Sequence, residues 1–173
     1  MSFGLEILTF AHVVISLVGI ASGVVVLSGL LRARRLDSWT ALFLSSTVLT
    51  SVSGFFFPVH RFMPSHAVGI LSLIALSIAI YARYGRHMAG HWRAGYVTTA
   101  MLALYLNMFV LVAQLFAKVP ALKAVAPTQS EPPFGITQLS VLVVFIALTV
   151  AAARRFARLR DAVPILPAVT TSA

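Results

Sequence analysis

Five long apolar runs, separated by short polar connections, constrain this chain more than any other feature of its sequence. A helix needs about 20 apolar residues to cross roughly 30 Å of bilayer hydrocarbon. Backbone groups cannot stay unsatisfied in lipid, and these runs are too long and too continuously apolar for barrel strands. We therefore predict an all-α bundle of five transmembrane helices. They cover about residues 7–31, 39–57, 66–84, 94–116 and 135–153.

The composition supports a membrane protein over a water-soluble one. The 173 residues are 60% hydrophobic and only 10% charged, whereas a soluble domain carries about 25% charged residues. We expect residues 1–173 to form a single transmembrane domain that retains its first span. The net charge of +9 does not indicate a nucleic-acid partner, because the basic residues lie at the ends of the apolar runs. The absence of cysteine excludes disulfides and thiolate metal sites.

The basic residues lie mainly on one side of the predicted bundle. Arginine-rich segments follow the first, third and fifth runs: they contain Arg32, Arg34, Arg35, Arg83, Arg86, Arg93, Arg154, Arg155, Arg158 and Arg160. The other connections contain only Arg61, Lys118 and Lys123. The positive-inside rule then predicts an inner (plasma) membrane protein with its N-terminus outside and its C-terminus in the cytoplasm. The proline-rich connection 118–134 would be outside, and the tail 154–173 would be cytoplasmic.

The first four runs show a weak internal repeat. His12 begins an apolar run that is followed by Trp39, and His66 begins one that is followed by Trp92, at nearly the same interval. This pattern predicts two parallel helical hairpins, related by an axis along the membrane normal, plus a fifth helix. Chance is the alternative, because spans have similar lengths and tryptophan often marks membrane interfaces.

Three histidines fall on the predicted outer side. His12 lies near the start of the first span, His66 begins the third span, and His60 lies in the connection between the second and third. Two imidazoles that face each other across a bundle can hold a haem iron, and three can bind copper or zinc. We therefore predict a haem b site or a copper or zinc site. The alternative is that these are interfacial histidines bonded to carbonyl groups or water.

Two amides in the fourth run extend this candidate site. Asn107 lies near the middle of the run, and Gln114 lies seven residues later, on the same helical face. Together with Glu131 and Gln138 they suggest a polar outer pocket for a quinone headgroup, a metal or a proton path. The alternative is that each amide bonds to a neighbouring helix. The serine, threonine and glycine residues of the first two spans are typical of close helix contacts, with a hydroxyl-lined ion path as the less favoured interpretation.

Short motifs repeated in the first and second hairpins suggest a family. The first is His12…Gly19…Gly23…Arg32-Ala33-Arg34-Arg35, and the second is His66…Gly69…Arg86-His87…His91-Trp92-Arg93-Ala94-Gly95-Tyr96-Val97. In these residues the chain resembles an uncharacterised group of small bacterial multi-pass integral membrane proteins, some of which are loosely similar to b561-type haem membrane proteins. The resemblance implies a haem-binding helical bundle. The chain lacks the pair of histidines deep within two helices that the haem pattern has.

The leading hypothesis is a protein that binds haem or a metal ion for electron transfer or metal handling. His12, His60 and His66 would be metal ligands, and His12, His66, Asn107 and Gln114 would line the cofactor site. The alternatives are a non-catalytic accessory or assembly subunit of a larger membrane complex, or a small transporter. We expect the lipid bilayer as partner, with other membrane subunits or a homo-oligomer as further options. No catalytic motif is present, so an enzyme is the less favoured class.

Overall fold

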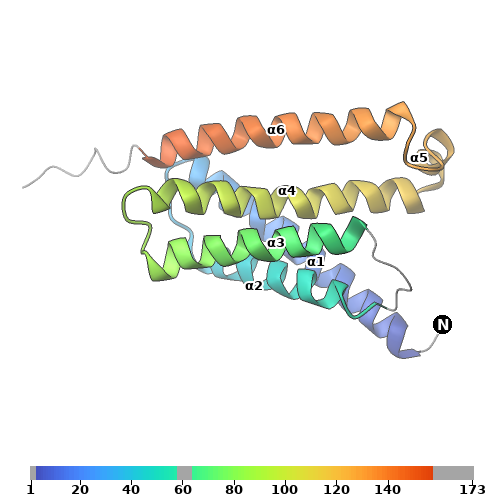
Figure 1. Cartoon of the computed structure of the whole chain (residues 1–173), viewed down its shortest axis with the longest axis horizontal. Coiled ribbons are helices and arrows are strands. Elements are labelled where there is room, and N and C mark those ends of the chain that lie inside the picture. Colours follow the sequence, from blue (N-terminus) through green and yellow to red (C-terminus); the bar gives the residue numbers. More distant parts are fainter. Residues whose placement is uncertain (1–2, 58–63, 158–173) are drawn as a thin grey trace, which may run out of the picture.

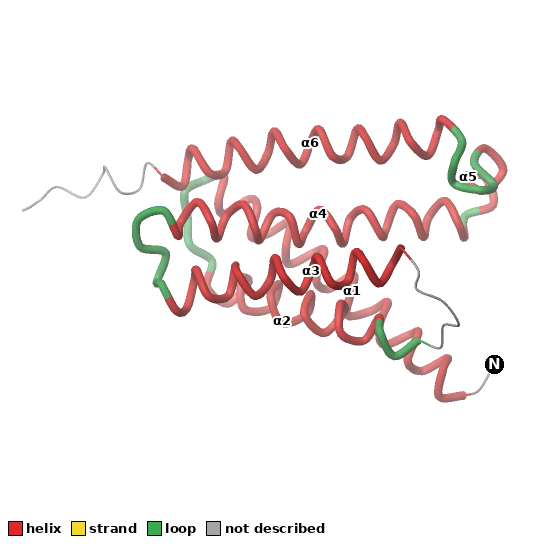
Figure 2. The backbone as a smooth tube through the Cα atoms, viewed as in Figure 1, coloured by secondary structure: helices red, strands yellow, loops and turns green. Residues whose placement is uncertain are grey.

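A computed structural model describes residues 3–57 and 64–157 of the chain. Helices account for 86% of these residues and none of them forms a strand, which confirms the predicted all-α class (Figure 2). The helices are α1 (Phe3–Leu31), α2 (Asp37–Gly54), α3 (Pro64–Ile80), η1 (Tyr81–Gly85), α4 (Trp92–Lys118), α5 (Pro120–Val125) and α6 (Pro132–Ala157). The element η1 is one turn of π-helix that continues α3.

Four of these helices are long and apolar enough to cross a membrane. They are α1, α3 continued by η1, α4 and α6. The prediction of five such spans is therefore only partly confirmed, because α2 does not meet the same standard within the described residues. The reason is composition, since Ser and Thr make up eight of its 18 residues. The chain is a multi-pass membrane-embedded protein by the length and composition of the other four helices.

The first four long helices form a ring. Each of α1, α2, α3 and α4 packs against the next, and α4 also packs against α1. Consecutive long helices run in opposite directions, so α1 and α3 are parallel and occupy diagonal positions (Figure 1). Helix α6 lies outside the ring against α4 and α1. This order follows from short connections, which make successive helices antiparallel neighbours.

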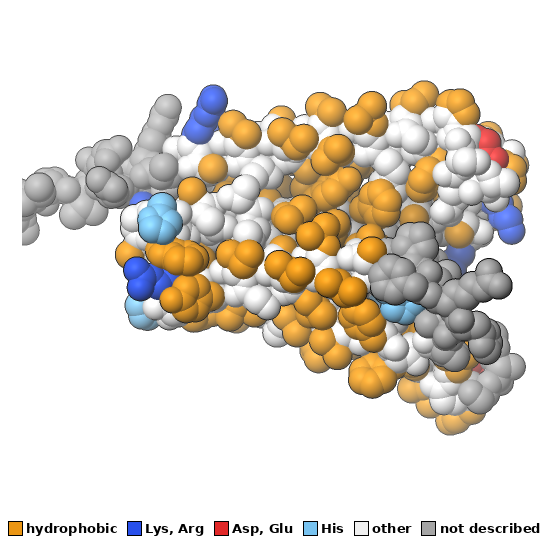
Figure 3. Space-filling model, viewed as in Figure 1, with side chains coloured by type: hydrophobic (Ala, Val, Ile, Leu, Met, Phe, Trp, Pro, Cys, Tyr) orange, Lys and Arg blue, Asp and Glu red, His pale blue; other side chains and the backbone are white. Residues whose placement is uncertain are grey.

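The two ends of the bundle differ in which helices begin and finish there. We call the Arg-rich end the one where α1, η1 and α6 finish and α4 begins. The opposite end contains the start of α1 and the end of α4 (Figure 1). On the face shown in Figure 3, charged side chains occupy the two ends and apolar side chains cover the space between them. Helices α1, α3, α4 and α6 thus bring the predicted arginine segments to one end of the molecule.

The main hydrophobic core lies in the half of the bundle nearer the Arg-rich end. Phe43 of α2 and Leu104 of α4 are fully buried there, together with Leu76 of α3. Gly23 of α1 faces Phe43 and Leu104 so closely that a Cβ atom would lie 2.5 Å from Leu104 Cδ1 and 2.9 Å from Phe43 Cδ2. This glycine therefore sets how closely α1 approaches α2 and α4, as small residues do in membrane bundles.

The connection between α4 and α6 differs from the predicted proline-rich loop 118–134. Lys118 still belongs to α4, Pro120 begins the short helix α5, and α6 already begins at Pro132. Ala126 is fully buried beside Phe116, so the connection packs onto the end of the bundle as a small second core. At the other end, α6 continues to Ala157, four residues into the predicted tail, and residues 158–173 lie outside the described part.

Helix α2 makes side-chain hydrogen bonds to several other elements. Four of its side chains bond to four different elements. The pairs are Ser53 with His12 of α1, Ser51 with Ser72 of α3, Thr47 with Asn107 of α4, and Asp37 with Arg83 of η1. Each hydrogen bond between membrane helices stabilises the bundle by about 0.6 kcal/mol on average. Three of the Ser and Thr residues that lower the hydropathy of α2, namely Thr47, Ser51 and Ser53, thus face its neighbours in the ring.

Candidate functional site

His12 lies at the level where α2 ends. Its Nδ1 atom is 2.8 Å from the hydroxyl oxygen of Ser53, and its ring meets that of Phe57 edge to face at a centroid distance of 5.2 Å. Gly54 leaves space next to the imidazole, since a Cβ there would lie 3.8 Å from His12 Cε1. The side chain is half-buried. His12 is therefore fixed from one side by a hydroxyl and an aromatic ring.

The hydroxyl oxygen of Ser53 has two partners, His12 Nδ1 at 2.8 Å and the backbone oxygen of Thr50 at 3.1 Å. In the tautomer that carries its proton on Nδ1, His12 donates to Ser53 and Ser53 donates to Thr50, which leaves the Nε2 lone pair for a ligand. A histidine that binds a metal usually donates its other N–H in this way. The Ser53 contact therefore orients the His12 ring.

His66 lies at the same end of the bundle, on the other side of α2. Its ring centroid is 5.7 Å from that of Phe55, which immediately follows α2. His12 contacts Phe57, two residues further on. The two histidines are thus at one level and flank the end of α2 from diagonal helices. The third predicted ligand, His60, lies outside the described residues.

The structure places Asn107 deeper than this level and leaves Gln114 on the surface. Asn107 donates from Nδ2 to Thr47 Oγ1 at 3.3 Å, and Thr47 lies six residues before Ser53 on α2. With a rise of 1.5 Å per residue, Asn107 is about 9 Å deeper in the bundle than the Ser53 level. Gln114 is exposed on the surface of α4. The structure therefore brings His12 and His66 to one end, but does not group Asn107 and Gln114 with them.

The interior below His12 is closely packed. At Gly19, two turns from His12, a Cβ would lie 3.2 Å from Thr47 Oγ1 and 3.3 Å from Ser46 Oγ. Further toward the Arg-rich end, the fully buried apolar side chains of Phe43 and Leu104 fill the interior. A flat macrocycle between the helices would need these contacts to open. The described residues, to which His60 does not belong, contain no group of three His, Cys, Asp or Glu side chains suited to a metal ion.

Two polar clusters were not anticipated from the sequence. Arg83 is buried at the Arg-rich end, where it pairs with Asp37 and lies over the rings of Tyr84 and Tyr96. The only available signal was an acidic residue, Asp37, directly after the first arginine-rich segment.

The second cluster consists of two glutamines that attach the later part of the chain to α4. Gln138 donates to the backbone oxygen of Phe109 at 3.1 Å, and Gln129 donates to that of Ala113 at 2.8 Å. Gln138, which the sequence suggests as part of a polar outer pocket, uses its amide N–H₂ to join α6 to α4.

Comparison of the chain with protein families, with curated proteins and with solved structures finds no match. What the site binds must therefore be inferred from its own residues and their geometry.

Proposed function

We propose that the chain is a bacterial inner-membrane protein with its N-terminus outside and its C-terminus in the cytoplasm. The concentration of arginines at one end of the bundle supports this orientation, because cytoplasmic connections are enriched in Lys and Arg. We further propose that α2 also crosses the bilayer. It connects the Arg-rich end of α1 to the opposite end, where α3 begins, and its 18 residues extend for about 27 Å. Six of its eight hydroxyl side chains have a hydrogen bond within the bundle, so α2 can cross although it is less apolar.

We propose that the outer end binds a copper or zinc ion through His12 and His66, for metal handling or electron transfer. The observation that carries this proposal is the 2.8 Å contact between His12 Nδ1 and the Ser53 hydroxyl, which orients the ring and, in the tautomer protonated on Nδ1, leaves Nε2 for a metal. Imidazole nitrogen is a good ligand for both metals. Haem b, with a porphyrin inserted between helices, is less well supported, because the interior below His12 is filled by Gly19, Ser46 and Thr47.

Metal binding by the purified full-length protein tests this proposal. The protein, purified without a polyhistidine tag and stripped with a chelator, is titrated with copper or zinc, and bound metal is measured by elemental analysis. We expect one equivalent per chain. His12→Ala and His66→Ala should each lower the affinity at least tenfold. Ser53→Ala should lower it about tenfold, because the partner that orients the ligating imidazole is lost.

Two matched variants control for general effects on the protein. His91→Ala removes an exposed histidine at the Arg-rich end, and Ser45→Ala removes an exposed hydroxyl that bonds only to its own helix. Neither should change metal affinity. A metal-free protein after titration, or His12→Ala and His66→Ala variants that bind metal normally, would refute the proposal. A visible haem spectrum after addition of haemin would favour the haem alternative.

A second candidate is an accessory or assembly subunit of a larger membrane complex. The first turns of α1 favour it, because α1 crosses the ring obliquely and its start extends away from α4 and α6 (Figure 1). Phe3 and Phe10 are 79% and 74% exposed there, which leaves two large aromatic side chains for a neighbouring helix to cover. Co-purification of one stoichiometric partner in mild detergent, lost in Phe10→Ala, would support this function.

A further inference from the structure

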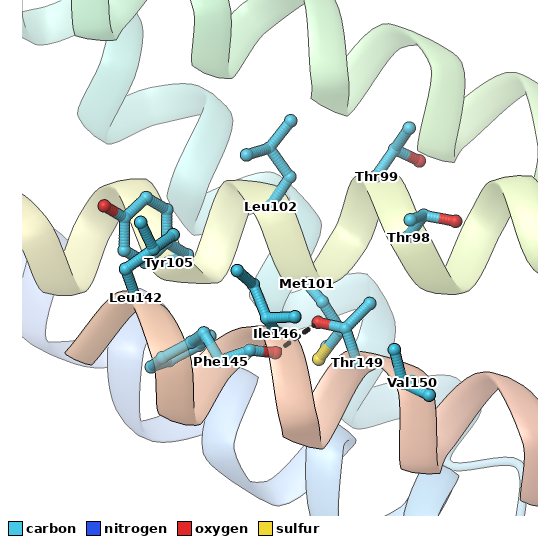
Figure 4. Close-up of a pocket in the computed structure, with 10 residues that line it drawn as sticks. All are labelled: Thr98, Thr99, Met101, Leu102, Tyr105, Leu142, Phe145, Ile146, Thr149 and Val150. Carbon is cyan, nitrogen blue, oxygen red and sulfur yellow. Dashed lines mark hydrogen bonds between the residues drawn. The ribbon is translucent and has the colours of Figure 1, made fainter. Parts of the chain in front are cut away.

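A groove of about 370 Å³ lies between α4 and α6. Its walls are formed mainly by apolar side chains, as Figure 4 shows, and include Leu102 and Tyr105 of α4 and Leu142, Ile146 and Val150 of α6. The volume is within the range of small-ligand sites.

The threonine hydroxyl groups in the groove are already satisfied by their own helices. Thr149 donates to the backbone oxygen of Phe145 at 2.6 Å, and Thr98 donates to that of Ala94. The groove therefore offers its occupant little besides hydrocarbon contact. A flexible hydrocarbon chain fits this chemistry, whereas a polar ligand would lose its hydrogen bonds to water on entry.

The groove lies at the level of the acyl chains of one lipid leaflet. On α4 it extends from Thr98 to Tyr105, which are six and 13 residues beyond Trp92 at the start of the helix. These residues lie about 9 Å and about 20 Å from Trp92 along the helix axis. Tryptophan prefers the headgroup level, and each leaflet contributes about 15 Å of hydrocarbon. The groove thus lies mainly among the acyl chains of the leaflet at the Arg-rich end.

The end of the groove nearest the headgroups is open and positively charged. Arg154 is exposed one helical turn beyond Val150, on the same face of α6. Gly95, about one turn before Thr98 and Thr99 on α4, has open space around the position of a Cβ. Arg93 lies over the ring of Phe156 and holds the start of α4 against the end of α6. A phosphate group at this mouth would meet the Arg154 guanidinium.

We infer that this groove binds an anionic phospholipid of the leaflet at the Arg-rich end. One acyl chain occupies the groove, and the phosphodiester and anionic headgroup contact Arg154. The inference rests on the proposed membrane placement but not on the metal site, which is at the other end. Apolar walls, leaflet depth and a basic mouth together favour a lipid, because another protein's helix in the groove would leave the Arg154 charge without a partner.

Lipid retention by the full-length protein tests the inference. The protein is reconstituted in vesicles of equimolar phosphatidylglycerol and phosphatidylcholine, extracted in mild detergent and examined by native mass spectrometry. We expect one retained phosphatidylglycerol, favoured over phosphatidylcholine about fivefold, as one nearby arginine predicts. Arg154→Gln should make retention of the two lipids equal. Thr98→Phe, which fills the groove, should reduce retention of both.

Arg86→Gln is the matched control. Arg86 is an exposed arginine at the same end, and it lies over the ring of Trp92. It follows η1, which continues α3 on the other side of α4 from α6 (Figure 1). The Arg86→Gln variant should keep the preference for phosphatidylglycerol over phosphatidylcholine. Ile146→Phe fills the groove from α6 and replaces Thr98→Phe if that variant does not fold. Equal retention of both lipids by the unaltered protein, or an unchanged preference in Arg154→Gln, would overturn the inference. So would a second polypeptide that is bound to the unaltered protein and lost in the groove-filling variants.

Discussion

At the scale of single residues, glycine and histidine positions show how closely neighbouring helices control each side chain. Gly23 allows α1 to approach Phe43 and Leu104, whereas Gly95 has open space around it. His12 is oriented by a serine that lies 41 residues away in the chain. The same residue types elsewhere, such as His91 in an exposed connection, have no comparable surroundings. Residue type alone therefore does not decide function or packing in this bundle.

A pair of glycine variants tests the packing at this scale. We expect Gly23→Ala to destabilise the protein by about 1–3 kcal/mol, because Phe43 and Leu104 are fully buried and cannot move aside freely. Gly95→Ala should be neutral or stabilise by up to about 1 kcal/mol, since alanine favours helix and meets no neighbour. Unfolding of both variants in mixed micelles, followed by circular dichroism, measures the difference. Equal stability of the two variants would contradict the close approach of α1.

At the scale of elements, the π-helical turn η1 places a buried cation against the start of α2. Arg83 has a side chain only 6% exposed, while that of its partner Asp37 is 76% exposed. The guanidinium also lies 5.4 Å from the ring centre of Tyr96 on α4. A π-helical turn changes the direction in which its side chains point. In this way η1 positions Arg83 between α2 and α4.

This ion pair predicts an asymmetric effect of substitution. Asp37→Asn should destabilise the bundle by about 1–3 kcal/mol, because a buried guanidinium loses its charged partner. The double variant Asp37→Asn with Arg83→Met should be more stable than Asp37→Asn alone, since the buried charge is then absent as well. Thermal unfolding of the single and double variants tests this order. If Asp37→Asn matches the unaltered protein, the pair contributes nothing.

Helix α6 begins at a carboxylate that holds the preceding turn. The Glu131 carboxylate accepts hydrogen bonds from the Thr128 hydroxyl at 2.8 Å and from the backbone N–H of Ser130 at 3.1 Å. Desolvation alone would raise the pKa of Glu131, but these hydrogen bonds outweigh it and hold the pKa below its ordinary value of 4.5. Because the folded pKa is the lower one, the stabilisation is complete above pH 4.5 and is lost as pH falls through the folded pKa.

This dependence predicts local opening of the α5–α6 connection in acid. Amide hydrogen exchange of residues 128–135, corrected for its intrinsic pH dependence, should show falling protection below pH 4.5. Glu131→Gln should have lower protection at neutral pH and should not change further between pH 6 and pH 3. The control is Glu6→Gln, which alters an exposed carboxylate in the first turn of α1. If protection in the unaltered protein stays constant with pH, the carboxylate does not hold this turn.

At the scale of the whole molecule, the two ends differ in chemistry. The Arg-rich end contains the ion pair of buried Arg83 with exposed Asp37, stacked guanidinium groups and the mouth of the α4–α6 groove. The opposite end contains the two described histidines that flank α2 and the packed connection around α5. We therefore expect the two ends to face different compartments, with metal chemistry outside and lipid headgroup recognition inside.

Single cysteines test this orientation, because the natural chain contains none. In whole cells, a membrane-impermeant maleimide should label Phe56→Cys and Ser130→Cys at the outer end. It should label Arg34→Cys and His91→Cys only after the membrane is permeabilised. Labelling of Arg34→Cys and Phe56→Cys from the same side would show that α2 does not cross the membrane. Labelling of His91→Cys in intact cells would reverse the proposed orientation.

Local patterns in the sequence predicted the all-α class, four of the five expected membrane-length helices that the structure confirms, and the end at which the arginines gather. These properties depend on local hydropathy and on charge along the chain, so they can be read one segment at a time. The tertiary structure alone decided that the polar residues of α2 reach four different elements, that Ser53 orients His12, and that Arg83 finds Asp37 46 residues away. It also separated Asn107 and Gln114 from the histidines, because depth and rotation of each helix depend on packing against its neighbours.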